Sequence, residues 1–219
     1  MDIAVRRYGH RGSLWITRFR FITLGGMKVA AVQLTSTGNI TENQEIALAK
    51  IREAAGNGAR LIVLPEATSQ NFRSGRLDEQ AQSLEGPFAT AIQALAEELE
   101  VTVVAGMFCP ADTVERDGKT INRVSNTALI AGPGVLGGYD KIHTYDAFDY
   151  RESDTVLAGE SLVAFDVDDL VVGVATCYDI RFPEQFKELA SQGAQLIVVP
   201  TSWADGPGNA QPPQNSSRF

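Results

Sequence analysis

The stretch LVVGVATCYDIRFPEQFKELASQGAQLIVVP, residues 170–200, decides the fold. It opens with an apolar run of Val, Gly and Ala, residues 170–176, whose composition is typical of a strand buried on both faces. A helix should follow, because apolar residues recur there at helical spacing and Gly193 is placed to end it. A second apolar run then reaches Pro200. The stretch therefore predicts a strand, a helix and a second strand, with the helical face made by Phe182, Phe186, Leu189 and Ala190.

Cys177 stands at the corner between the first of these strands and the helix. A thiol at the carboxyl end of a buried strand and ahead of a helix N-terminus lies near backbone N–H donors and a partial positive charge, which favour the thiolate. Its position makes Cys177 a candidate nucleophile. The alternative is an inert core thiol, because free cysteines are among the most often buried residues.

The same strand and helix pattern occurs earlier in the chain. Val29 to Leu34 reads as a strand, and a helix with a capping box at Thr41 and Gln44 is expected before the strand Leu61 to Leu64. Pro87 is placed to open a further helix, which leads into a strand over residues 101–107. Repeated strand-helix-strand units imply parallel pairing and an α/β fold.

Two hairpins should add antiparallel strands to this parallel pattern. Residues 126–131 and 135–141 flank the turn Gly132-Pro133-Gly134, and residues 162–166 and 170–176 form a second candidate pair. Mixed sheets are therefore expected.

An internal echo indicates two related halves. GARLIVLP at residues 58–65 recurs as GAQLIVVP at residues 193–200, each time after a strand and a helix. Two sheets would then face each other, each covered outside by helices, although chance likeness between buried strands gives the same echo. In this arrangement Glu66 and Cys177 both sit at carboxyl ends of strands, where open α/β sheets place their ligands.

Composition excludes several classes of protein. The chain has 219 residues, 44% of them hydrophobic, and a net charge of −8, which argues against nucleic acid or an anionic membrane as its main partner. With two cysteines and two histidines, and no Cys/His cluster, a metal site is not expected. No apolar run reaches the length of a membrane span, so the cytoplasm is the expected compartment.

The two ends differ from the acidic body. Residues 1–26 carry five arginines against one aspartate and are expected to be a disordered extension; a transit peptide is the alternative. Residues 209–219 are rich in Pro, Gln and Ser and are expected to be a disordered tail. Residues 27–208 would form one domain.

Two further residues at strand ends complete a reactive set with Cys177. They are Glu66 in LIVLPEA and Lys141 in GGYDKIH. Such a set suffices for acyl transfer, since the thiol attacks a carbonyl or nitrile carbon, the carboxylate moves protons and the ammonium stabilises the oxyanion. Taken singly, Glu66 and Lys141 could equally be solvated surface charges.

These motifs resemble the nitrilase superfamily, the carbon-nitrogen hydrolases with a Glu-Lys-Cys triad, and its amidase-like branch of omega-amidase and deaminated-glutathione amidase. LPEA, YDKIH and CYDIRFPE occur in the family's order, and YRESDTVLAGE looks like the segment with the family's second glutamate, here Glu152. The resemblance covers residues 28 to about 208. It implies a four-layer αββα sandwich of two mixed sheets, a homodimer or higher homo-oligomer, and no metal or organic cofactor.

By this resemblance Glu66 would be the general base, Lys141 the stabiliser of the oxyanion and Cys177 the nucleophile that forms a thioester. Glu152 would orient the substrate or Lys141, and the backbone N–H of Tyr178 would be a second oxyanion donor.

Trp203 either lines the pocket or only packs. Asp179, Arg181 and Glu184 are expected to brace the corner, His143 to be structural and Cys109 to be a core thiol.

The resemblance implies hydrolysis of a small linear amide to ammonia and a carboxylic acid. N-carbamoyl amidohydrolase and nitrilase activities share the triad and remain alternatives. The chain departs from the family after Trp203, where family members continue through a further helix and strands. An incomplete second sheet is therefore expected, and a catalytically silent fragment, or a subunit that pairs with complete copies, is the other alternative.

Overall fold

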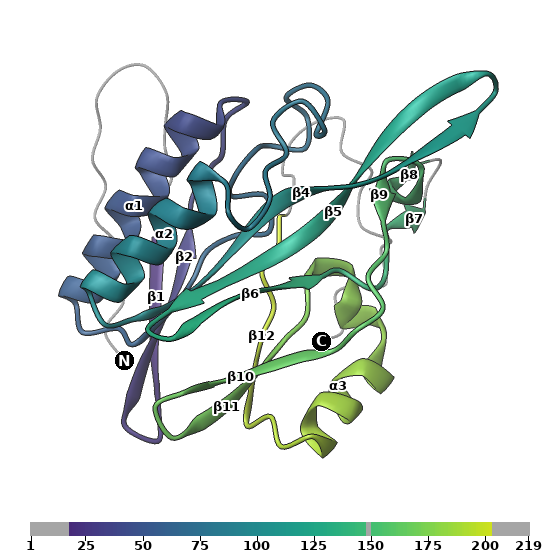
Figure 1. Cartoon of the computed structure of the whole chain (residues 1–219). Helices are drawn as coiled ribbons and strands as arrows, with labels where there is room; N and C mark the ends of the chain where they lie inside the picture. The colour runs from purple at the N-terminus through teal and green to yellow at the C-terminus, as the bar shows by residue number, and fades with distance from the viewer. Residues whose placement is uncertain (1–17, 148–149, 203–219) are drawn as a thin grey trace.

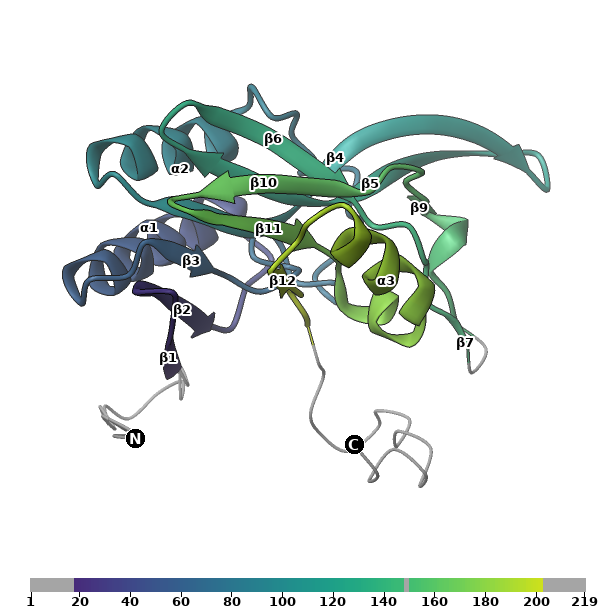
Figure 2. The same cartoon turned by 90° about the horizontal axis from the view of Figure 1, so that it is seen from below.

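The computed structural model describes residues 18–147 and 150–202, which form two facing sheets with helices on both outer sides (Figure 1). Helices α1 and α2 cover the larger sheet, and α3 covers the smaller one (Figures 1 and 2). This order of layers is the predicted four-layer αββα arrangement of two mixed sheets, which is confirmed.

Within the described residues the larger sheet has seven strands, ordered β1-β2-β3-β4-β5-β6 with β9 beside β5. The strands β2, β3 and β4 run parallel, while β1, β5 and β6 pair antiparallel with their neighbours. Its members are β1 (Arg18–Leu24), β2 (Met27–Gln33), β3 (Leu61–Val63), β4 (Thr102–Arg116), β5 (Lys119–Gly132), β6 (Val135–Asp140) and β9 (Val156–Leu157).

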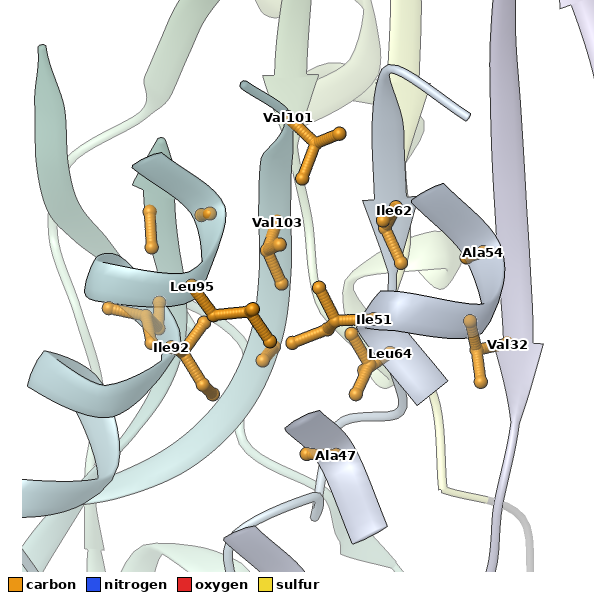
Figure 3. Packing of buried hydrophobic residues seen from close by; sticks show 14 of the residues in the cluster. Val32, Ala47, Ile51, Ala54, Ile62, Leu64, Ile92, Leu95, Val101 and Val103 are labelled. Atoms are coloured by element: carbon orange, nitrogen blue, oxygen red, sulfur yellow. The ribbon is translucent and has the colours of Figure 1, made fainter. Parts of the chain in front are cut away.

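Helices α1 (Ile40–Gly56) and α2 (Pro87–Glu98) are the crossovers of the parallel part of this sheet. Their apolar faces meet the sheet in a core cluster that is shown in Figure 3 and includes Ile51, Leu64, Ile92 and Val103. Burial of these side chains fixes both helices on the outer face of the sheet.

The predicted capping box of α1 is wrong. The side chain of Asn39, not Thr41, caps α1 by accepting from the backbone N–H groups of Thr41 and Glu42. Asn39 is itself a strong capping residue, and the helix begins at Ile40, before the expected position.

The smaller sheet has the order β10-β11-β12 in the described part of the chain. Strands β10 (Val163–Val167) and β11 (Leu170–Val174) form the expected hairpin, and β12 (Leu196–Val198) pairs parallel with β11. The crossover is α3 (Pro183–Ser191), whose Leu189 lies beside Gly173 on the outer face of the sheet. Residues 170–200 therefore fold as the predicted strand, helix and second strand.

A second core cluster joins the two sheets. It unites side chains from β2, β3, β4, β5 and β6 with those of the smaller sheet; the fully or nearly buried members include Val29, Leu61, Val104, Ile130, Tyr139, Val172 and Val174. Because β3 and β11 contribute to the same cluster, their carboxyl ends, which precede Glu66 and Cys177, are held in one region of the molecule.

Two expectations about the chain need correction or extension. Disorder was expected over residues 1–26, but residues 18–24 form β1, which pairs with β2 over its whole length.

Strands β4 and β5 are also longer than predicted and project beyond the body as a hairpin (Figure 1). Its turn is Asp117-Gly118, and both residues have positive φ, as such tight turns require. The expected tail at residues 209–219 lies outside the described residues.

Short elements follow β6. They are β7 (Asp146–Ala147), β8 (Tyr150–Arg151) and the 3₁₀ helix η1 (Glu152–Asp154). No described helix combines the length and the apolar character that crossing a membrane would need.

Candidate active site

Glu66 lies just beyond β3 and is 2% exposed. Its position depends on Gly106 of β4, whose N–H donates to the carbonyl of Pro65 at 3.0 Å. A Cβ on Gly106 would lie 1.5 Å from the carbonyl oxygen of Glu66, so only glycine permits this approach of the two backbones. The peptide of Glu66 is thereby held against the sheet before any side-chain contact is counted.

Lys141 follows β6 directly and points into the same buried region, also 2% exposed. Its backbone N–H donates to the carbonyl of Asn126 at 2.9 Å, which extends the β5–β6 ladder by one residue. The ammonium Nζ lies 3.2 Å from Glu66 Oε1 and 2.8 Å from Glu152 Oε2. One cation therefore joins two buried carboxylates.

Glu152 is placed by the first turn of η1 and is as buried as its partners. Besides Lys141, its Oε2 accepts the backbone N–H of Tyr145 at 2.6 Å, and its own N–H donates to the carbonyl of Tyr145 at 3.1 Å. These two bonds fix the loop after β6 around the ammonium group of Lys141.

The charge balance of the cluster keeps Lys141 protonated. Burial lowers the pKa of Lys141, but the negative charges of Glu66 and Glu152 together outweigh burial and hold it above its usual range. A buried ion pair of this kind is strongly destabilised when one partner is removed, because the remaining charge is left unpaired. The three groups therefore act as one electrostatic unit.

Cys177 forms the corner after β11, where the 3₁₀ helix η2 (Cys177–Arg181) begins. Its φ of 45° lies in the left-handed region, which is strained for a residue other than glycine. Its backbone N–H donates to the carbonyl of Pro200 beyond β12 at 2.9 Å, which holds the corner in place. Strain of this kind is concentrated at functional sites, where it aims one side chain.

The thiol of Cys177 is not the thiolate that its position suggested. Burial raises its pKa to about 12, assisted by the negative charge of Glu66, and the charge of Lys141 only partly opposes this. The carboxylate of Glu66 lies beside the thiol, and its Oε2 accepts the backbone N–H of Ser202 at 3.0 Å. The prediction of a thiolate stabilised by a helix terminus is therefore wrong, since burial and a neighbouring carboxylate dominate.

Asp179 connects the corner to the segment around Lys141. Fully buried, it accepts the N–H of Thr176 at 2.7 Å, the hydroxyl of Tyr139 at 2.6 Å and the N–H of His143 at 2.9 Å. Burial and the charge of Asp179 raise the pKa of Tyr139, so the phenol stays a donor. Asp179 therefore braces the corner from within the site's supporting structure, as the sequence indicated.

The ring of His143 contacts Phe182 and Asp179. It stacks on Phe182 with centroids 3.6 Å apart, and its Nδ1 lies 2.9 Å from Asp179 Oδ1. These contacts give His143 a structural place next to Asp179.

Asn126 is a member of the site that the sequence interpretation missed. Its Nδ2 donates to Glu66 Oε1 at 2.9 Å and to Glu152 Oε1 at 3.2 Å, while its Oδ1 is buried with no partner in the described part of the chain. An unpaired buried acceptor costs about 1–3 kcal/mol, and two hydrogen bonds to charged groups contribute about 1.5–3 kcal/mol each. The two bonds outweigh the unpaired oxygen and fix the orientation of the amide.

The remaining predicted site residues have different outcomes. Tyr178 follows Cys177, and its ring meets those of Tyr145 and Phe182 edge to face; among residues 18–147 and 150–202 its backbone N–H has no hydrogen-bond partner. Trp203 lies outside the described residues. Glu66, Lys141, Glu152 and Cys177 are thus brought together, and Tyr178 adjoins them.

Cys109 lies apart from this cluster. It is partly buried against the first core cluster, and burial raises its pKa. It lines a separate pocket of about 390 Å³ with Ser125, Thr127 and Asp140, which alternate along β5 and β6 with the site residues Asn126 and Lys141. In the part of the chain that the structure describes, no group of three or more His, Cys, Asp or Glu residues could hold a metal ion.

Curated relatives match most of this chain. A hydrolase of Mycobacterium tuberculosis is 43% identical over 190 residues, which are 84% of this chain and 64% of the relative. A deaminated glutathione amidase of Escherichia coli O157:H7 is 35% identical over 83% of this chain and 68% of its own length. An omega-amidase of Danio rerio is 32% identical over 79% of this chain and 62% of its own length. The chain spans about two thirds of the length of these relatives.

Solved structures support the fold. An amidase from Nesterenkonia sp. superposes with a TM-score of 0.68 at 22% identity, over 84% of this chain and 68% of that protein. Residues 28–217 match the family described as carbon-nitrogen hydrolase. With this match and relatives above 30% identity, the chain belongs to the carbon-nitrogen hydrolase family.

Proposed function

We propose that this protein hydrolyses the C–N bond of a small linear amide through a thioester on Cys177. The observation that carries the proposal is the meeting of three groups from separate strands: Glu66 lies beside the Cys177 thiol, and its Oε1 is 3.2 Å from the ammonium Nζ of Lys141. A nucleophile, a base and a cation within contact distance are what acyl transfer requires.

In the first half of the reaction, Glu66 would take the thiol proton while the sulfur of Cys177 forms a bond to the amide carbon. The raised pKa of Cys177, about 12, means that proton transfer accompanies the attack instead of preceding it. The carbonyl oxygen gains the negative charge, which the ammonium of Lys141 and the backbone N–H of Tyr178 would stabilise. The C–N bond then breaks, and the nitrogen takes the proton from Glu66 and leaves as ammonia.

In the second half, Glu66 would take a proton from water while the water oxygen bonds to the thioester carbon. The C–S bond breaks, the carboxylic acid leaves, and Glu66 returns the proton to the sulfur. Glu152 would hold Lys141 in place through both halves, since its Oε2 is 2.8 Å from Nζ. The sum is amide plus water giving acid plus ammonia.

The relatives support an amide over other substrates. The two amidases of Escherichia coli and Danio rerio act on amides by their names. N-carbamoyl amino acids and nitriles remain alternative substrates because they also present an electrophilic carbon to the same three groups.

The test is ammonia release by the full chain from a panel of linear amides, N-carbamoyl amino acids and nitriles. Release from amides, lost in Cys177→Ala and kept in Cys109→Ala, is the expected result. Turnover of nitriles alone would reject the amidase proposal. No release from any substrate, together with equal and slow alkylation of Cys177 and Cys109, would favour the catalytically silent alternative.

A further inference from the structure

We propose that Asn126 is a positioning residue that holds Glu66 and Glu152 on one shared donor and so keeps Oε2 of Glu66 aimed at Cys177 as the acceptor of its proton. This deepens the proposed function and rests on it. Asn126 is no part of the predicted triad, and no motif around it pointed to the site.

The four side chains form a closed ring of contacts. Lys141 Nζ lies 3.2 Å from Glu66 Oε1 and 3.1 Å from Glu152 Oε1, and Asn126 Nδ2 lies 2.9 Å and 3.2 Å from the same two oxygens. Two donors therefore alternate with two acceptors. A single amide NH₂ has two hydrogens, one for each carboxylate, which matches this geometry.

The donors of the ring offset the repulsion between the carboxylates of Glu66 and Glu152. Two carboxylates in one buried site disfavour each other's charged form, and one of them then retains a proton. Lys141 alone supplies one positive charge to two carboxylates. The amide of Asn126 adds a donor to each carboxylate without a further charge.

The ring also determines which oxygen of Glu66 faces the thiol. Oε1 accepts from Lys141 and Asn126, whereas Oε2 accepts, in the part of the chain that the structure describes, only the N–H of Ser202 at 3.0 Å. Oε2 therefore has the remaining capacity to accept the proton of Cys177. Loss of Asn126 would free Oε1 from one donor and let the carboxylate turn or take up a proton.

Alternation of side chains along β5 turns Asn126, and not its neighbours, toward Glu66 and Lys141. Asn126 is 1% exposed, and its carbonyl accepts the N–H of Lys141, so its backbone and side chain both bind the site. Its neighbours Ser125 and Thr127 line the pocket on the other face of the sheet.

The test uses the full chain with Asn126→Asp, Asn126→Ala and Asn126→Ser. Asn122→Asp is the matched control: it lies on the same strand, is exposed, and its Nδ2 also donates to a carboxylate, that of Asp78 at 3.2 Å. The readout is the rate of alkylation of Cys177 by iodoacetamide against pH, measured by mass spectrometry with Cys109 as internal reference.

Alkylation requires the thiol proton to leave, and Glu66 can accept it only while it carries none itself. In Asn126→Asp a third carboxyl joins the pair, so the acid limb of the Cys177 curve is expected to move to higher pH by about one unit or more. Asn126→Ala should move it in the same direction, and Asn126→Ser, which keeps one donor, should fall between Ala and wild type. Cys109 and the Asn122→Asp curve should not change.

The inference is overturned if the Cys177 curves of the folded variants superimpose on that of the wild type. If Asn126→Asp fails to fold, the Ala and Ser variants, which add no charge, give the same reading. Failure of the proposed function is separate: it is absence of ammonia release by the wild type from any amide, whether or not the acid limb moves. Ammonia release with unmoved curves would leave the function standing and refute the role of Asn126.

Discussion

Glu66 and Cys177 follow strands of different sheets, yet the carboxylate of Glu66 lies beside the thiol of Cys177. Glu66 follows β3 of the larger sheet and Cys177 follows β11 of the smaller one. The contact therefore depends on the packing between the sheets, and the carboxylate that accepts the thiol proton also disfavours the thiolate. The raised pKa therefore favours the neutral thiol of Cys177 beside Glu66.

The raised pKa of Cys177 predicts that the free energy of unfolding depends on pH. The folded chain holds the proton of Cys177 with a pKa of about 12, above the ordinary value of 9.0, so the fold binds that proton more tightly than the unfolded chain does. The stabilisation is complete below pH 9 and is lost as pH rises toward 12, at up to about 1.4 kcal/mol per pH unit. Urea denaturation of wild type and Cys177→Ala across the alkaline range measures it.

Relative to Cys177→Ala, the wild type should lose free energy of unfolding only on the alkaline side. Taking this difference cancels the titration of groups that both proteins share. A difference that stays constant with pH, or a wild type that gains stability, would contradict the raised pKa.

Lys141→Met tests the buried ion cluster. The substitution keeps much of the side-chain volume and leaves Glu66 and Glu152 without their cation, so we expect a loss of about 3–5 kcal/mol in free energy of unfolding. Adding Glu66→Gln should recover part of that loss, because one of the unpaired charges is then removed. Two losses that simply add, in urea denaturation at neutral pH, would show that the groups are not coupled.

Much of this site followed from local sequence, and the rest did not. Glu66, Lys141 and Cys177 were found because each ends an apolar strand, and strand ends gather at one edge of a sheet. Asn126 was missed because it lies inside a strand, where a polar residue reads as an ordinary outward position. Only the register of β5 against β6, which pairs Thr127 with Asp140, turns it toward Lys141.

The protonation of Cys177 could not be predicted for a related reason. A helix terminus is visible in the sequence, but burial and the distance to Glu66 are results of tertiary packing. Similarly, the hairpin turn at Asp117-Gly118 carries a recognisable signal that was not used, whereas the pairing of β1 with β2 depends on Phe19 packing against the first core cluster. Local sequence patterns therefore predict the helices and strands, whereas the protonation of Cys177 depends on contacts between them.

Asp179→Asn tests the connection between the corner and the Lys141 segment. The asparagine keeps one oxygen, so its NH₂ group would face either the N–H of His143 or the N–H of Thr176 together with the Tyr139 hydroxyl. We expect a loss of about 1–3 kcal/mol in free energy of unfolding. Ammonia release should fall as well, because Cys177 would lose its fixed direction. Chemical denaturation and amide turnover are the measurements.

The control for this variant is Asp168→Asn, which breaks an exposed ion pair with Arg60. An exposed pair contributes about 0–1 kcal/mol, so this change should be small and should leave turnover intact. If the two variants behaved alike, Asp179 would have no special bracing role.

Gly106→Ala tests whether the backbone approach behind Glu66 is required. The added methyl would meet the Glu66 carbonyl oxygen at 1.5 Å, and that atom belongs to the backbone and cannot turn aside as a side chain could. Either β4 or the Glu66 peptide must move, so we expect a loss of about 1–3 kcal/mol or more together with loss of turnover. Gly137→Ala on β6 is the matched control, since a methyl there would meet no heavy atom within 4 Å. Thermal unfolding and ammonia release compare the two. A Gly106→Ala protein as stable and active as Gly137→Ala would mean that Glu66 is held by its side-chain contacts to Lys141 and Asn126 alone, and that the glycine is incidental.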